Sequence, residues 1–76
     1  MAGDNIHVVF DKKSWAVKRE GSKYNMSTHS SQEMAIDVAR ASAMAQESDL
    51  IIFNRNGQIL DRDSYRKPPT PPSSNS

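Results

Sequence analysis

Hydrophobic and polar positions in the first part of the chain follow the pattern of short β-strands separated by turns. Residues 6–10 (IHVVF) are rich in β-branched side chains, and residues 15–19 (WAVKR) follow after a polar break that is long enough for a hairpin loop. A third strand is predicted over residues 24–28. Because side chains alternate along a strand, Trp15 and Ala16 are expected on opposite faces of the sheet.

The middle of the chain carries the pattern of a single helix. Residues 32–46 are good helix formers without glycine or proline, and Ser30 with Glu33 forms the Ser-x-x-Glu capping box that opens a helix. One side of this helix is a stripe of small and apolar residues, which predicts close packing against a sheet. The stripe consists of Ala35, Ile36, Ala39, Ala43 and Gln46, with Met34 and Val38 at its margins. The opposite side is expected to be solvated and to offer no apolar anchor; it carries Asp37, Arg40, Ser42 and Glu47.

Two further strands are predicted after the helix. Residues 50–54 (LIIFN) are apolar at four consecutive positions, which is typical of a central strand that is covered on both faces. Asn56 and Gly57 suit a hairpin turn, and residues 58–61 (QILD) return as the last strand. The order strand, strand, strand, helix, strand, strand predicts an α+β fold. With short connections throughout, we expect a small antiparallel sheet with one helix packed on one face.

The composition changes at Lys67, and this change sets the predicted domain boundary. With 36% hydrophobic and 25% charged residues, the 76-residue chain has a globular composition. We expect a flexible N-terminus over residues 1–5, one α+β domain over residues 6–66, and a disordered tail rich in proline and serine over residues 67–76. The tail contains the P-x-x-P spacing, so it is either a solubilising extension or a docking ligand for an aromatic groove.

Cysteine content and the length of apolar segments bear on where the protein works. The chain has no cysteine, which excludes disulfide bridges and thiolate metal sites, and small secreted domains normally need such links. Residues 1–5 lack the pattern of a signal peptide. The longest apolar run, residues 50–53, is far shorter than the roughly 20 residues that span a bilayer. These features predict a cytoplasmic protein that does not contact a membrane.

Residues that are often catalytic are present but lack a diagnostic arrangement. His7 and His29 each lack a partner at a spacing typical of a metal site or of acid–base chemistry, so they are interpreted as surface or turn residues. Asp61 and Asp63 share one face of a strand, as a divalent-metal pair would. The alternative is a solvated strand end in which the two aspartates pair with Arg55 or Arg66. The sequence therefore predicts no enzyme activity, no cofactor and no metal site.

A surplus of apolar strand residues is the main indication of function. One helix covers one face of a sheet, whereas apolar side chains of the predicted strands point to both faces, so some of them must meet the tail, a second copy or a partner. This predicts a non-catalytic protein-interaction module that binds through the face or the edge of its sheet. The predicted binding residues are Val9, Trp15, Ile51, Phe53, Leu60, Arg62 and Tyr65.

Two alternatives remain for the function. Basic residues near the first hairpins predict a nucleic-acid-binding accessory protein, although ten basic against nine acidic residues give a net charge of only +1. The residues of this predicted patch are Lys12, Lys13, Lys18, Arg19 and Lys23. The plainer interpretation is that these lysines keep sheet edges from pairing with neighbours. The second alternative is a self-associating structural protein.

Several short stretches spread over residues 6–66 form a distinctive set. They are His7 to Val9, Trp15 to Lys18, Ala35 and Ile36, Ala39 and Arg40, Gly57, and Asp61 to Tyr65. Together they resemble a family of small bacterial and phage proteins catalogued as domain of unknown function 2188. The resemblance implies a compact sheet-and-helix module in the bacterial cytoplasm, or in the host cytoplasm for a phage protein. A phage protein of this size suits a small inhibitor or modulator of a host enzyme such as the transcription machinery. The resemblance implies no catalytic residues.

Overall fold

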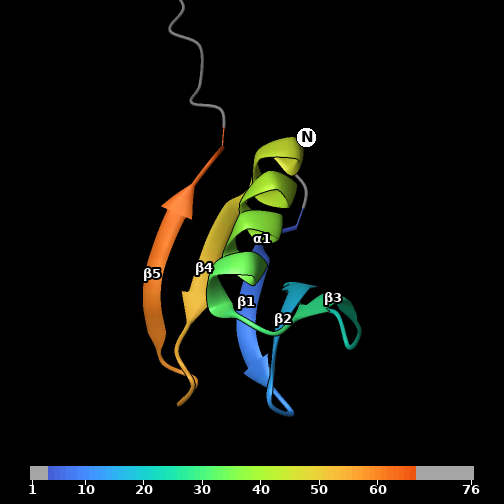
Figure 1. Ribbon diagram of the computed structural model, residues 1–76. Coiled ribbons are helices and arrows are strands. Elements are labelled where there is room, and N and C mark those ends of the chain that lie inside the picture. Colours follow the sequence, from blue (N-terminus) through green and yellow to red (C-terminus); the bar gives the residue numbers. More distant parts are fainter. Residues whose placement is uncertain (1–3, 67–76) are drawn as a thin grey trace, which may run out of the picture.

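One helix lies against one face of a five-stranded sheet (Figure 1). The computed structural model describes residues 4–66. Its elements are β1 (Ile6–Asp11), β2 (Ser14–Arg19), β3 (Asn25–His29), α1 (Gln32–Gln46), β4 (Asp49–Phe53) and β5 (Ile59–Ser64). The predicted α+β fold and the order of its elements are confirmed. The predicted tail, residues 67–76, and residues 1–3 of the predicted flexible N-terminus lie outside the described residues.

The sheet is mixed rather than entirely antiparallel. Its strands lie in the order β3-β2-β1-β4-β5, and the central pair β1 and β4 is parallel while the other three pairs are antiparallel. Short loops enforce antiparallel pairing only between strands that a hairpin joins. The helix returns the chain to the end of the sheet where β3 began, so β4 runs in the direction of β3 and therefore of β1 (Figure 1).

The hydrophobic core lies between α1 and the central strands. Alternate residues of β1, β2 and β4 face the helix, and they are buried: Ile6, Val8, Trp15, Val17, Leu50 and Ile52. From the helix, Ala35, Ala39 and Ala43 meet them and are fully buried. These residues recur every four positions and have small side chains, so the helix axis can approach the sheet closely. The predicted alanine stripe is confirmed as the buried side of the helix.

The helix begins one residue later than the capping box predicts. Ser31 is the N-cap, in extended conformation, and its hydroxyl accepts a hydrogen bond of 3.2 Å from the Met34 backbone N–H. The predicted cap at Ser30 is therefore wrong. Both serines precede the same helix-forming run, and the residue whose backbone is extended directly before the first helical residue is the one positioned to cap. Ser30 is an exposed residue before that position.

Two hairpin turns lie at the same end of the sheet (Figure 1). Because β1 and β4 are parallel, the turns that follow them lie side by side at this end. The first is a two-residue loop between the paired residues Asp11 and Ser14. Both loop residues, Lys12 and Lys13, have left-handed φ angles of 50° and 68°. Lysine adopts this region at a conformational cost that asparagine or glycine largely avoids.

Candidate functional site

The side of α1 that points away from the sheet carries exposed apolar residues beside the acidic Glu33 and Asp37. Met34 is 53% exposed, Val38 40% and Met44 56%, although they are apolar residues on a helix that already buries another side. Ala41 and Ala45 are also exposed. The expectation that this side offers no apolar anchor is therefore wrong. Met34 and Val38 lie on the outer surface of the helix rather than at the margin of its buried stripe.

Four of these residues form one continuous line along the helix. Met34, Val38, Ala41 and Ala45 are separated by four, three and four positions, which places them on one side of an α-helix. We call these four residues the outer stripe. An exposed stripe with this spacing has the form of a surface against which a second helix packs.

A flank of the outer stripe carries charged groups next to the end of β5. The Arg40 guanidinium donates a hydrogen bond of 3.1 Å from Nε to the Tyr65 hydroxyl and lies 3.8 Å from the Asp37 carboxylate. The Tyr65 hydrogen bond, followed by the negative charges of Asp63 and Asp37, raises the pKa of Arg40. Arg40 is therefore held between the helix and the strand end rather than offered to solvent as a free cation.

Two aspartates of β5 lie on the helix side of the sheet. Asp61 pairs with Ile52 and Asp63 pairs with Leu50 in the β4–β5 ladder, and directly paired residues share a face. Asp61 also accepts a hydrogen bond of 2.8 Å from the Arg62 backbone N–H. The predicted pairing of these aspartates with Arg55 or Arg66 is absent from the ion pairs found within residues 4–66, and Arg66 instead binds Asp49.

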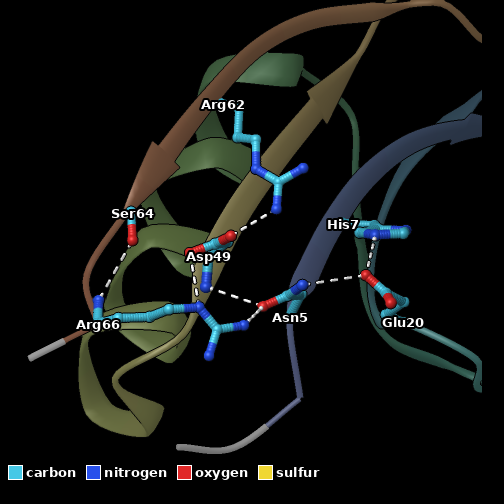
Figure 2. Close-up of polar contacts among 7 residues, drawn as sticks. All are labelled: Asn5, His7, Glu20, Asp49, Arg62, Ser64 and Arg66. Atoms are coloured by element: carbon cyan, nitrogen blue, oxygen red, sulfur yellow. Dashed lines mark hydrogen bonds and ion pairs between the residues drawn. The ribbon is translucent and has the colours of Figure 1, made fainter.

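The opposite face of the sheet, which α1 does not cover, carries a polar network at one end (Figure 2). Asp49 is 6% exposed and its carboxylate accepts hydrogen bonds from Arg62 at 2.5 Å and from Arg66 at 3.1 Å. The hydrogen bonds from Arg62 and then from the Ser64 hydroxyl hold the pKa of Asp49 below its ordinary value. Sequence reasoning missed this cluster, because its members lie far apart in the chain.

Asn5 connects this cluster to β2 and to the start of β4. Its side-chain oxygen accepts from the Arg66 guanidinium at 2.8 Å and from the Asp49 backbone N–H at 3.0 Å (Figure 2). Its amide nitrogen donates to Glu20 at 3.1 Å. Glu20 also lies 3.3 Å from His7 Nε2, and the hydrogen bonds from Asn5 and then His7 lower the pKa of Glu20. Every charged group in this network has a partner within it, so the network is a structural element rather than an open binding site.

The predicted protein-binding residues do not form one surface. Trp15 is 8% exposed in the helix-facing core, and Tyr65 packs against that core beside Arg40. Four residues share the uncovered face: Val9, Ile51, Phe53 and Arg62. Ile51 is only 3% exposed there, whereas Leu60 of β5 is 58% exposed. The structure thus brings together four of the seven residues, places Trp15 in the core and packs the half-buried Tyr65 against that core.

The predicted nucleic-acid-binding residues are also separated. Lys12 and Lys13 lie in the β1–β2 turn, whereas Arg19 ends β2 and Lys23 follows in the next loop. At about 3.3 Å per residue, β2 alone separates the two groups by roughly 17 Å. Lys18 lies on the uncovered face beside His7, with which it pairs. The structure places another cation, Arg55, 4.8 Å from the centre of the Phe10 ring.

Within residues 4–66, no helix is long and apolar enough to cross a membrane, and no three side chains of the types His, Asp or Glu are grouped so that they could hold a metal ion.

Comparison with known proteins identifies the family. Searches of curated proteins and of solved structures gave no match. The model of one family, described as "Uncharacterized protein conserved in bacteria (DUF2188)", matches residues 6–65. This match covers every strand and the helix, and the chain therefore belongs to the DUF2188 family.

Proposed function

We propose that this domain is a non-catalytic module that binds another protein through the outer side of α1. The observation that carries the proposal is the exposure of Met34, Val38 and Met44 on a helix whose other side is already buried. Exposed apolar residues that occur singly are normal, whereas a continuous line of them on one element is typical of an interaction surface.

The side chains of the outer stripe suit such a contact. Methionine is flexible and polarisable, so Met34 in the stripe and Met44 beside it can adapt to the shape of a partner. Ala41 and Ala45 lack bulk, so a partner can approach the C-terminal half of the helix closely. The uncovered sheet face is a weaker candidate, because Ala16 and Ile51 are already buried there and one end is occupied by the polar network around Asp49.

Site-specific cross-linking tests this proposal. A photoreactive amino acid replaces Val38 on the outer stripe, Val9 on the uncovered sheet face, or Lys23 in the β2–β3 loop, and the full chain is irradiated in bacterial cells. We expect a cross-linked protein at Val38 that is lost when Met34→Ser is added, and none at Lys23. Cross-linking at Val9 alone would move the binding surface to the sheet. No adduct at any of these positions would contradict the proposed function.

A nucleic-acid-binding function is the second candidate, and the shared position of two hairpin turns favours it. Lys12 and Lys13 lie at the same end of the sheet as Arg55, whose guanidinium covers the Phe10 ring. Neutralisation of phosphates by these groups would make binding strongly salt-dependent. We expect the triple variant Lys12→Ala, Lys13→Ala, Arg55→Ala to lower the slope of log affinity against log salt by up to about three. Salt-insensitive binding, or none at low salt, excludes this candidate.

A further inference from the structure

The outer stripe has the spacing of one half of a helix–helix contact. Successive separations of four, three and four residues are those at which side chains of one helix fit between those of a second helix. The larger side chains, Met34 and Val38, occupy the N-terminal half, and Ala41 and Ala45 occupy the C-terminal half. A helix laid along this surface would therefore meet protruding side chains at one end and a shallow surface at the other.

The flank of the stripe that faces β5 is acidic although the whole chain has a net charge of +1. Glu33 and Asp37 are exposed on α1, and Asp61 and Asp63 lie on the helix side of β5. Arg40 is the one cation within α1, and the Tyr65 hydroxyl and Asp37 already engage it. Negative charge therefore predominates on this part of the helix side.

Basic residues that form no ion pair within residues 4–66 gather instead at the two hairpin turns, which carry Lys12, Lys13 and Arg55. On the uncovered face, Arg62 and Arg66 are paired with Asp49. A net charge near zero therefore conceals an acidic helix side. Surface charges contribute little affinity one by one, but together they select a partner of opposite sign and suppress partners of the same sign.

From this combination we infer that the partner of the outer stripe is a basic amphipathic helix of another protein. The inference rests on the proposed function and adds the chemistry of the partner. Apolar residues of that helix cover Met34 and Val38, and its lysine or arginine side chains lie against the exposed acidic residues Glu33 and Asp37. A second copy of this chain is a poorer occupant, because its helix would bring the same acidic residues to the contact.

Synthetic peptides test the inference with the full chain. The probe is a fluorescent peptide of about 18 residues, long enough for a helix, with leucine on one side and lysine on the other. One control peptide carries glutamate in place of every lysine, and another keeps the composition but shuffles the order, so that no apolar side forms. Binding is measured by fluorescence anisotropy at an ionic strength of about 0.15 M.

Matched variants separate the contributions of the two parts of the surface. Met34→Ser with Val38→Ser removes the large apolar side chains, and Glu33→Gln with Asp37→Asn removes charge while keeping shape. Leu60→Ser with Asp11→Asn makes the same two kinds of change elsewhere, at exposed positions of β5 and β1. Circular dichroism melting establishes that each variant is folded before its affinity is measured.

We expect the basic amphipathic peptide to bind with a dissociation constant on the order of micromolar, and each helix double variant to weaken it about tenfold or more. The Leu60 and Asp11 control should leave the affinity within about a factor of two. Equal binding of the acidic or the shuffled peptide, or equal loss in the control variant, overturns the inference. So does a dimer, detected by sedimentation without peptide, that Val38→Ser dissociates. If Val38 cross-links a protein in cells while the basic peptide fails to bind, the proposed function stands and the inferred charge of the partner is wrong.

Discussion

At Asp49 a carboxylate that is almost inaccessible to solvent is held by two arginines that follow it by 13 and 17 positions in the chain. A buried charge is tolerated only when hydrogen bonds and opposite charges replace the water that it loses. Here Arg62 and Arg66 supply both, and the pKa of Asp49 falls below its ordinary value as a result. The sequence contains no signal for this arrangement, since aspartate and arginine are common on solvated strand ends.

The lowered pKa of Asp49 predicts a pH dependence of stability. A group whose pKa is lower in the folded state stabilises the fold above its unfolded pKa, here ordinarily 3.8, and this contribution disappears as the pH falls through the folded pKa. We expect Asp49→Asn to lower the melting temperature near neutral pH, and the difference from wild type to shrink as the pH falls below 3.8. Melting curves of both proteins across this range, with Asp11→Asn as an exposed control, provide the measurement. A difference that does not depend on pH would contradict the assigned role of the Asp49 charge.

The β1–β2 turn holds two lysines in left-handed backbone conformation, which the sequence did not predict. A hairpin loop was predicted over the polar residues 11–14, but Asp11 and Ser14 are paired within the strands and the loop is only Lys12 and Lys13. Lysine gives no signal for left-handed backbone. The two-residue loop between paired Asp11 and Ser14 imposes positive φ on both central residues, because that twist matches the twist of the flanking strands. The pairing of β1 with β2 here overrides the preference of lysine for negative φ.

Replacement of the two lysines by Asn-Gly should stabilise the fold. Asparagine and glycine adopt left-handed φ more readily than lysine, so Lys12→Asn with Lys13→Gly is expected to raise the free energy of unfolding by about 1 kcal/mol. Lys12→Ala with Lys13→Ala removes the same charges but keeps side chains that resist this conformation, and it should give no such gain. Urea denaturation distinguishes the two variants. An equal gain in both would attribute the effect to charge rather than to backbone conformation.

At the scale of the element, α1 shows what periodicity can and cannot predict. Its extent and its buried alanines follow from helix-forming residues at regular spacing, and both predictions are confirmed. Its outer surface was misjudged because alanine occurs on both sides of the helix and because Met34 and Val38 were assigned to the margin of the buried stripe, whereas both are exposed. Only the position of the sheet decides which side is buried. The cap was misplaced by one residue for a similar reason, since two adjacent serines precede the helix.

The adjacent serines give the helix cap a matched test. Ser31→Ala removes the acceptor for the Met34 N–H and should lower the free energy of unfolding by about 0.5–2 kcal/mol. Ser30→Ala changes an exposed residue one position earlier and should stay within about 0.5 kcal/mol of wild type. Denaturant melts of both variants are the measurement. A larger effect at Ser30 would restore the capping box that the sequence predicts.

At the scale of the whole molecule, the sheet depends on contacts between distant parts of the chain. The hairpins β1–β2 and β4–β5 were predictable because each is local. The parallel pairing of β1 with β4 joins the two hairpins, and no local pattern specifies it. The polar network reinforces this junction, since Asn5 and Arg66 are hydrogen-bonded across 61 positions of sequence. Contacts of this separation form only when the helix has brought the second hairpin alongside the first.

Asn5 is the residue whose loss should show the importance of this junction. Its side chain bonds three groups that belong to different parts of the sheet: Glu20 after β2, the Asp49 N–H at the start of β4, and Arg66 after β5. Removing it leaves the Asp49 N–H without that partner in a partly buried site, where an unsatisfied group costs about 1–3 kcal/mol, whereas Glu20 and Arg66 are exposed and can bind water instead. We expect Asn5→Ala to lower the free energy of unfolding by about that amount.

In Asn5→Ala, amide hydrogen exchange should become faster in β4 and β5 before the rest of the sheet is affected. The reason is that the contacts of Asn5 hold the β4–β5 hairpin to β1. Asn25→Ala is the matched control, since Asn25 is exposed and its side chain makes one long contact of 3.5 Å to Asp11. Hydrogen exchange followed by mass spectrometry, with denaturant melts of the same samples, measures both effects. Uniform acceleration across all five strands would show that the two hairpins unfold as one unit, and unchanged exchange in β5 would mean that Asn5 does not secure the junction.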